Sequence, residues 1–324
     1  MGFPIQRMRR LRRNETIRNM VRESRVSVAD LIYPMFVTHG RGVKKEIDVL
    51  PGNFHLSVDR LEEEARAVYD LGIPAVILFG LPGKRDEAAS EAYDPKGIVQ
   101  VAIRRLKKSV PDLVVVTDVC LCEYTPHGHC GVMKDGYLQN DPSLDLIRKV
   151  TLAQAEAGSD IVAPAAMLDG EVAAMRSALD EQGFIHVVIM GYSAKMASKL
   201  YDPFFKGGTE SAVAFGDKKS HQMDFSNANE ALREIGLDIE EGADIVMVKP
   251  GMFYMDIIYR AKQKFGVPLA VYNVSGEYAM IKSAAQLGRI DEKEITLELL
   301  TSFKRAGADL ILTYSARDVA PLLK

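Results

Sequence analysis

The sequence predicts an α/β protein built as a closed (β/α)8 barrel, the TIM barrel, with an N-terminal arm before it. Short apolar runs alternate with segments of helical periodicity, which is typical of a parallel sheet covered by helices. There are eight such runs, the number that closes this kind of barrel. A glycine-containing repeat precedes three of the runs, where the preceding helices should end.

The predicted strands are bounded by turn residues and cover residues 31–37, 73–79, 113–119, 160–166, 186–190, 244–248, 268–274 and 309–313. The predicted helices between them include residues 58–71, 145–157, 170–182, 253–265 and 293–306. The repeat reads AGSD at 157–160, EGAD at 241–244 and AGAD at 306–309. An open doubly wound sheet is the competing fold, but residues 38–42, THGRG, do not fit the phosphate-binding pattern GxGxxG.

The composition is that of an ordinary soluble protein, with 324 residues and a net charge of −3 at pH 7. The longest apolar stretches have about eight residues, far fewer than the roughly 20 that a membrane span needs. No signal-peptide pattern is present at the start of the sequence. We therefore expect a cytoplasmic protein with no membrane partner.

Residues 1–30 are expected to form a basic arm, and residues 31–324 the catalytic barrel domain. Arginines outnumber Glu15 and Glu23 in this segment: Arg7, Arg9, Arg10, Arg12, Arg13, Arg18, Arg22 and Arg25. Nucleic-acid binding is one interpretation, but the arm has no recognition motif and no interleaved aromatic residues. We favour an arm that packs on a neighbouring subunit and expect no nucleic-acid partner.

Lys249 is the first candidate catalytic residue, because it ends a buried apolar run and is followed by Pro250-Gly251. A lysine held against apolar walls loses hydration, its pKa falls, and the neutral amine can attack a carbonyl to form a Schiff base. The ordinary alternative is a lysine that reaches from a strand end to solvent.

Lys195 is the second candidate and favours the catalytic interpretation. It follows the run 186–190 and residues 191–194, where a strand should give way to a helix. Lys199, four residues later, would then share a helical face with Lys195 and help to keep it neutral. Two amines at two strand ends suggest a reaction of two carbonyl groups.

The three cysteines, Cys120, Cys122 and Cys130, lie close together in the sequence and cannot all pair in internal disulfides. If residues 113–119 form a strand, the first two thiols point to the same side, and the loop 123–129 could return Cys130 to them. Three thiolates would leave one zinc position open, as in catalytic sites. Free buried thiols remain an alternative, because the spacing is not a usual zinc-finger pattern. His127 and His129 could also be ligands, although their Gly and Pro neighbours favour polar loop residues.

Chemically active side chains gather where the predicted strands end. In addition to the lysines and cysteines, these are Asp118, Ser275 and Tyr314. Active sites of (β/α)8 barrels form at the carboxyl ends of the strands, so this distribution indicates an enzyme. Taken singly, Ser275 and Tyr314 are more often turn and rim residues.

Several long motifs resemble the porphobilinogen synthase (5-aminolevulinate dehydratase) family over nearly the whole chain. They are MVKPG at 247–251, VSGEYAM at 274–280, SEAY at 90–93 and DVCLCEYT at 118–125. The cysteines match the zinc-dependent branch of the family. The resemblance implies condensation of two 5-aminolevulinate molecules into porphobilinogen, with loss of two waters, in tetrapyrrole (haem) biosynthesis.

The resemblance also implies a role for each residue at the strand ends. Lys249 would form a Schiff base with the molecule that becomes the propionyl side, and Lys195 with the one that becomes the acetyl side. Ser275 and Tyr314 would hold the first substrate's carboxylate, and Asp118 would stabilise charge near the amines. Zinc on Cys120, Cys122 and Cys130 would bind and polarise the second substrate.

The segment between Lys195 and Asn229 resembles the family's active-site lid. In it Gln222 matches a residue that contacts the second substrate's carboxylate. The family usually has two arginines near that carboxylate, but this chain has Phe205 followed by Lys206 at one place and Lys218 at the other. Ala165 stands where the family has a serine. These departures put the second substrate's affinity or identity in question.

Glu234 matches the carboxylate that binds an activating magnesium ion between subunits in some members. The resemblance further implies a homo-octamer assembled through the arms. A related Schiff-base condensing enzyme or aldolase that acts on a different amino ketone is the second hypothesis. A catalytically silent zinc-binding or nucleic-acid-binding protein is the third.

Overall fold

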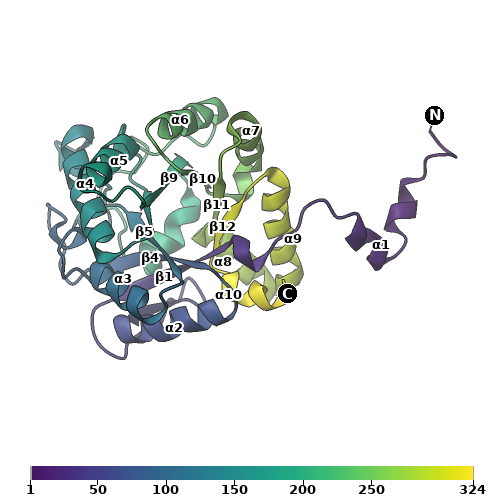
Figure 1. Ribbon diagram of the computed structural model, residues 1–324, viewed down its shortest axis with the longest axis horizontal. Helices are drawn as coiled ribbons and strands as arrows, with labels where there is room; N and C mark the ends of the chain where they lie inside the picture. The colour runs from purple at the N-terminus through teal and green to yellow at the C-terminus, as the bar shows by residue number, and fades with distance from the viewer. Residues whose placement is uncertain (1, 324) are drawn as a thin grey trace.

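The computed structural model describes residues 2–323 and contains a closed barrel of parallel strands surrounded by helices (Figure 1). The barrel strands are β1 (Leu31–Thr38), β4 (Ala75–Leu81), β5 (Val114–Val119), β8 (Ile161–Pro164), β9 (Val188–Lys195), β10 (Ile245–Lys249), β11 (Leu269–Asn273) and β12 (Leu310–Thr313). They follow one another around the barrel in chain order, and β12 pairs with β1 to close it. The predicted TIM barrel is confirmed.

The helices cover the outside of the barrel. They are α2 (Val58–Asp70), α3 (Ile98–Ser109), α4 (Asn140–Ala157), α5 (Glu171–Glu181), α6 (Ala228–Glu240), α7 (Met255–Phe265), α8 (Ser275–Gln286), α9 (Glu292–Ala306) and α10 (Ala316–Val319). On α3, Ala102, Ile103 and Leu106 are buried, at the spacing of one helical face. They pack on Val76 and Leu78 of β4, so the apolar stripe of the helix explains its docking on the sheet.

In the described part of the chain, four short strands and several helical turns lie outside the eight barrel strands. The strands β2 (Lys44–Glu46) and β3 (Phe54–Ser57) extend the sheet beside β1, and β6 (Val132–Lys134) pairs with β7 (Tyr137–Gln139) in a separate hairpin. Short helical turns lie at η2 (Val28–Asp30), η3 (Ser90–Ala92), η4 (Lys199–Tyr201), η5 (Phe204–Gly208), η6 (Met252–Tyr254) and η7 (Ala320–Leu322).

The repeated glycine and aspartate have a structural explanation that the sequence did not reveal. Each glycine has a positive φ after its helix, 104° at Gly158 and Gly242 and 115° at Gly307, as predicted. Each aspartate two residues later accepts a hydrogen bond from the first or second amide of the preceding barrel strand. The three bonds are Val115 to Asp160, Ile189 to Asp244 and Leu269 to Asp309, all 2.8 Å long. The repeat therefore ties the start of one strand to the start of the next.

The fifth barrel strand is longer than predicted. It continues through residues 191–194 to Lys195, which pairs in register with Lys249 of β10. Lys199 is exposed in the η4 turn, so the predicted helical face shared by Lys195 and Lys199 is wrong.

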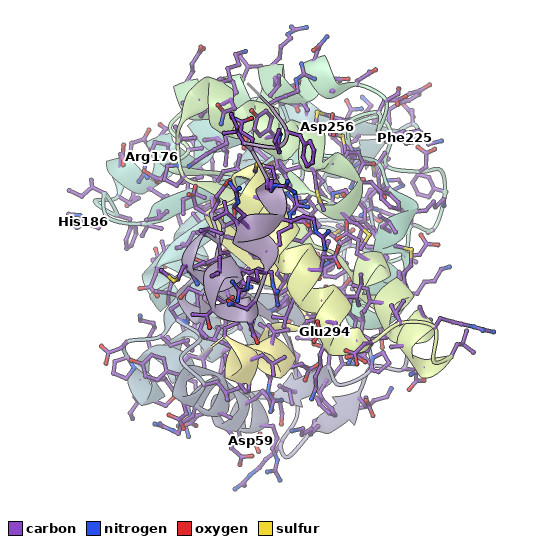
Figure 2. All side chains as sticks on the ribbon, turned by 90° about the vertical axis from the view of Figure 1, so that its right-hand side faces the viewer. Asp59, Arg176, His186, Phe225, Asp256 and Glu294 are labelled. Carbon is purple, nitrogen blue, oxygen red and sulfur yellow. The ribbon has the colours of Figure 1, made fainter. Side chains whose placement is uncertain are left out.

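The N-terminal arm extends away from the barrel (Figure 1). It contains η1 (Met8–Arg12) and α1 (Glu15–Met20), and neither of these helices buries a residue. Figure 2 looks along the arm toward the barrel, with the arm in front. Among the described residues, no helix combines the length and the apolar character that a membrane crossing requires.

Candidate active site

Two lysines face each other at the carboxyl ends of adjacent barrel strands. Lys249 ends β10 and Lys195 ends β9, and the two residues are partners in the sheet register. Met247 packs in the core inside the barrel, so Lys249, two residues later on the strand, points toward the same interior. Both side chains are buried, with Lys249 6% and Lys195 5% exposed. The structure therefore excludes the alternative in which Lys249 reaches out to solvent.

Aromatic rings surround the amine of Lys249. Its Nζ lies 4.3 Å from the ring centroid of Tyr272, 4.7 Å from that of Tyr192, and 5.4 Å from those of Tyr201 and Phe204. Burial, together with the charge of Lys195, lowers the pKa of Lys249 to about 7. A large share of this amine is therefore neutral near pH 7 and available as a nucleophile.

Lys195 has a different electrostatic environment. Its Nζ donates a hydrogen bond to the backbone carbonyl of Ala165. Burial opposes the charge of Lys195, but the thiols of Cys130 and Cys120 and the Asp118 carboxyl outweigh it and raise the pKa of Lys195. The prediction that Lys199 keeps Lys195 neutral is therefore wrong. Instead, burial and the charge of Lys195 lower the pKa of Lys249.

Asp118 lies on β5 and faces the two amines. Burial, with the nearby Glu123 carboxyl, raises the pKa of Asp118 to about 7, while the charges of Lys249 and Lys195 act in the opposite direction. A carboxyl group with such a pKa can both accept and release a proton near neutral pH.

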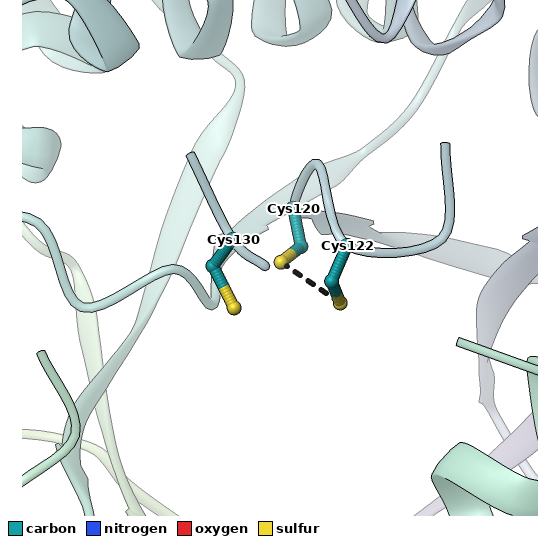
Figure 3. Close-up of side chains that lie close together, drawn as sticks. All are labelled: Cys120, Cys122 and Cys130. Atoms are coloured by element: carbon teal, nitrogen blue, oxygen red, sulfur yellow. Dashed lines mark hydrogen bonds between the residues drawn. The ribbon is translucent and has the colours of Figure 1, made fainter. Parts of the chain in front are cut away.

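The three cysteines form one buried cluster (Figure 3). Their Sγ atoms all lie within 4.8 Å of one another, and those of Cys120 and Cys122 are 3.3 Å apart. No pair forms a disulfide among the described residues, so all three thiols are free. Hydrogen bonds from Cys120 and Cys122 lower the pKa of Cys130 well below its usual range. Three converging sulfur donors, one of them readily ionised, fit a thiophilic metal ion such as zinc.

The two loop histidines do not belong to this group of ligand atoms. His129 Nε2 lies 2.9 Å from the Phe215 carbonyl oxygen, and the His129 amide donates to His127 Nδ1 at 3.0 Å. These contacts agree with the interpretation of both as polar loop residues.

One cavity brings most of the predicted residues together. It is lined by Asp118, Cys120, Cys122, Glu123, Ala165, Lys195, Tyr201, Phe204, Phe205, Lys249, Tyr272, Val274, Ser275 and Tyr314. Ser275 Oγ donates to the Leu200 carbonyl and accepts from the Phe204 amide, both at 3.1 Å. The hydroxyl groups of Tyr314 and Tyr272 are 3.2 Å apart.

The predicted lid residues divide into two groups. Lys218 and Gln222 are buried; Lys218 Nζ lies 3.5 Å from Cys130 Sγ and 4.1 Å from the ring centroid of Phe205. In contrast, Lys206 is exposed and pairs with Asp202 at 3.1 Å, while its neighbour Phe205 lines the cavity. The structure thus does not bring Lys206 to the other site residues.

Glu234 lies on α6 and does not line the cavity. Partial burial, with the nearby acids Asp169 and Glu230, raises the pKa of Glu234. A surface position among other carboxylates is compatible with a cation site at a subunit interface.

Sequence reasoning missed Glu123 and the aromatic lining of the cavity. Tyr192 and Tyr272 are polar-tipped residues inside otherwise apolar strands and lie on the inner face of the barrel. A tyrosine within an apolar strand was the feature that could have revealed them. However, side chains alternate between the two faces of a strand, and the sequence does not show which face lies inside the barrel.

A family model of delta-aminolevulinic acid dehydratase matches residues 5–322. The chain belongs to the delta-aminolevulinic acid dehydratase family. It is 56% identical to the delta-aminolevulinic acid dehydratase of Synechococcus elongatus over 98% of both chains. It is 50% identical to that of Bacillus subtilis over 100% of this chain and 99% of the other.

A solved structure of the same family has nearly the same fold. The delta-aminolevulinic acid dehydratase (porphobilinogen synthase) of Toxoplasma gondii, in complex with the reaction product porphobilinogen, superposes with a TM-score of 0.96. The two sequences are 41% identical, and the match covers 99% of this chain and 92% of that one. The family resemblance found in the sequence is confirmed.

Proposed function

We infer that this chain is a porphobilinogen synthase, a lyase that condenses two molecules of 5-aminolevulinate into porphobilinogen with loss of two waters. Family membership supports this function. The observation that carries it in the structure is the pairing of two buried lysines, Lys195 and Lys249, in one cavity beside three free cysteines. Two ketone substrates require two amines, and the cavity supplies both.

The low pKa of Lys249 supports its role as the amine that binds the first substrate. Its neutral Nζ attacks the ketone carbon, and loss of the ketone oxygen as water gives the Schiff base. Ser275 and Tyr314, which line the same cavity, would hold the carboxylate of this molecule.

Lys195 would form the second Schiff base. Because its pKa is raised in the substrate-free protein, it must first give up a proton, and Asp118, whose side chain lines the same cavity, would receive it. Asp118 would then return protons to the departing water molecules. Lys195 would therefore depend on Asp118 for proton transfer more than Lys249 does.

Cys120, Cys122 and Cys130 would hold the zinc ion, and the bound ion supplies a Lewis acid that polarises the second substrate. Lys218 lies beside the cluster, and the backbone amide of the buried Gln222 donates a hydrogen bond to the Lys218 carbonyl; both residues would contact the second carboxylate. Lys206 would reach it only if the lid rearranges, because its side chain points outward in the structure.

Assembly and location are further parts of the proposal. We propose that the arm of residues 1–30 joins copies of the chain into a homo-oligomer, an octamer by the family resemblance, and that Glu234 binds an activating magnesium ion between subunits. We also propose a cytoplasmic enzyme of haem biosynthesis, with 5-aminolevulinate as its small-molecule partner.

The direct test is porphobilinogen formation from 5-aminolevulinate by the purified protein, with and without a zinc chelator. We expect pyrrole formation that the chelator abolishes and added zinc restores. Zinc-loaded protein that forms no pyrrole would contradict the proposed reaction, and full activity after complete removal of zinc would contradict the metal's role.

One observation favours a second candidate, a condensing enzyme for a different amino ketone. Phe205 presents a ring to the cavity, and Lys218 stacks on that ring. Lysine keeps the positive charge but lacks the bidentate fork of arginine, so this side of the cavity holds a carboxylate less tightly and favours an amino ketone whose far end is apolar. Trapping of 5-aminolevulinate on Lys249 without pyrrole formation would identify this alternative.

A further inference from the structure

The turn at residues 218–223, called the lid turn here, packs directly on the cysteine cluster. The amides of His221 and Gln222 both donate to the Lys218 carbonyl, at 3.3 and 2.9 Å, which makes the turn tight. The Met223 amide donates to the Lys195 carbonyl at 3.1 Å and ties the turn to the end of β9. Lys218 Nζ, 3.5 Å from Cys130 Sγ, completes the contact with the cluster.

His221 is the residue of the lid turn whose chemistry is unexplained. Its imidazole lies against the Cys130 thiol. Its Nδ1 is 3.2 Å from the Ser220 hydroxyl oxygen, while its Nε2 is buried and has no hydrogen-bond partner. Buried polar atoms normally have a partner, so this nitrogen requires an explanation.

The arrangement of the two ring nitrogens matches that of a metal-ligating histidine. Such residues bind the metal through one nitrogen, while a hydrogen bond to the other fixes the tautomer and the ring orientation. With Nδ1 donating to Ser220, the neutral ring has a free lone pair on Nε2. Three cysteine ligands leave one position for a further donor.

We propose that His221, through Nε2, is the fourth ligand of the metal ion held by Cys120, Cys122 and Cys130 in the substrate-free enzyme. Among the described residues, two sets of ligand atoms lie mutually within 4.8 Å at this place, the three sulfurs and the group of Asp118, Cys120 and Glu123, and His221 is in neither set. The lid turn must therefore move toward the ion for Nε2 to bind, and metal binding would draw the lid onto the site.

The charges of the surrounding groups support a neutral fourth ligand. Three thiolates and a divalent ion carry one net negative charge, and the ammonium of Lys218 beside Cys130 balances it. A neutral imidazole leaves this balance unchanged, whereas the carboxylate of Glu123, whose Oε2 lies 3.3 Å from Cys122 Sγ, would add a buried negative charge as a ligand.

The consequence for catalysis rests on the proposed function. If the second substrate binds the same ion, it would take the place of the His221 imidazole, and the lid turn would be released. Because Met223 bonds to the carbonyl of Lys195, this movement is transmitted to the lysine that forms the second Schiff base. The metal would thus be closed to other ligands until the second substrate arrives.

X-ray absorption at the zinc edge of the full-length, zinc-loaded protein without substrate tests the ligand assignment. We expect three sulfurs and one nitrogen, with the outer-shell scattering of an imidazole, and we expect His221→Phe to lose this scattering. His127→Phe is the matched control, because His127 Nε2 also has no hydrogen-bond partner but lies outside the sulfur group. Absence of imidazole scattering in the unmodified protein, its persistence in His221→Phe, or its loss in His127→Phe would each overturn the proposal. If His221→Phe does not fold, the spectrum of the unmodified protein decides alone.

Zinc affinity gives a second measurement that does not depend on activity. Competition with a chelator should show binding at least about tenfold weaker in His221→Phe than in the unmodified protein. Equal affinities would contradict the assignment. Borohydride trapping of 5-aminolevulinate on Lys249 separates the proposed function from the ligand assignment. If the protein traps no substrate but its zinc shows imidazole scattering, the proposed function is refuted and the ligand assignment stands.

Discussion

The neutral amine of Lys249 follows from where the chain places it. Burial is the main cause of its pKa of about 7, and the charge of Lys195 adds to it. Only the neutral form attacks a ketone, so the rate of Schiff-base formation should rise with pH, reach its midpoint near pH 7 and then level off. Single-turnover borohydride trapping of 5-aminolevulinate measures this profile.

Removing the charge of Lys195 should shift the pH profile of Schiff-base formation to higher pH. In Lys195→Met the pKa of Lys249 should rise, so the midpoint should shift to higher pH. Lys264→Met, which alters an exposed lysine on α7, is the control and should leave the midpoint unchanged. A midpoint near 10.5 in the unmodified protein, the ordinary value for lysine, would show that burial does not tune this amine.

A substitution can also separate the role of the cysteines from the role of the lysines. Cys122→Ala removes one of three metal ligands but leaves the ring-lined pocket of Lys249 in place. We expect pyrrole formation to fall about 100-fold or more, while trapping of the first substrate on Lys249 continues. Both are measured on one zinc-loaded preparation. Loss of trapping together with pyrrole formation would mean that the cluster supports the whole site rather than the second substrate.

Site residues could be predicted from the sequence where a polar or reactive side chain ends a buried strand. They could not be predicted where an irregular backbone decides which way the side chain points. Lys249 and the cysteines were recognisable because an amine or a thiol at the end of a buried strand is uncommon. Lys206 and Phe205 were not separable, because the η5 turn at Phe204–Gly208 does not have the regular helical period. In that turn Phe205 lines the cavity and Lys206 faces Asp202.

At the level of elements, the strands and helices were predictable because apolar periodicity follows burial. The prediction ended the fifth barrel strand at Met190 because Gly191 and Ser193 interrupt the apolar run. In the structure, a Cβ on Gly191 would lie 2.8 Å from Asp238 Oδ2 of α6. The glycine therefore reflects a close helix–strand approach, which depends on tertiary packing and leaves no local signal of its own.

The aspartate of the repeat should contribute measurably to the stability of the barrel. Asp309 accepts from the Leu269 amide at 2.8 Å and from Lys262 Nζ at 2.7 Å. Asp309→Ala leaves the amide at the start of β11 unpaired, which should lower the free energy of unfolding by about 1–3 kcal/mol. Urea unfolding followed by circular dichroism measures the loss. Asp112→Ala, at an exposed position, should change little, and an equal loss in both variants would show that the bond to β11 is not the cause.

The proposed magnesium site lies outside the cavity, because Glu234 is on the outer helix α6. If Glu234 binds the ion, Glu234→Gln should remove the stimulation of porphobilinogen formation by magnesium without removing the basal activity. Glu240→Gln, an exposed position on the same helix, is the control and should retain the stimulation. Equal stimulation of all three proteins would reject Glu234 as the site.

The arm leaves apolar side chains uncovered in the single chain. Phe3, Ile5, Met8 and Met20 are each more than 60% exposed, and an apolar surface of this kind is normally covered by a partner. The arm of residues 1–30 carries a formal charge of +5, which leaves −8 on residues 31–324. A second copy thus offers the arm a surface of opposite charge, and the arm's own barrel does not cover it.

Deletion of residues 2–25 should therefore reduce the size of the assembly and leave the barrel folded. The η1 and α1 helices bury no residue, so their removal takes nothing from the core. Native mass spectrometry measures the assembly, and circular dichroism checks the fold. Raised salt should weaken the full-length assembly in part, because screening reduces the attraction between arm and barrel but not the apolar contact. A truncated protein that assembles like the full chain would mean that the barrel surfaces alone hold the copies together.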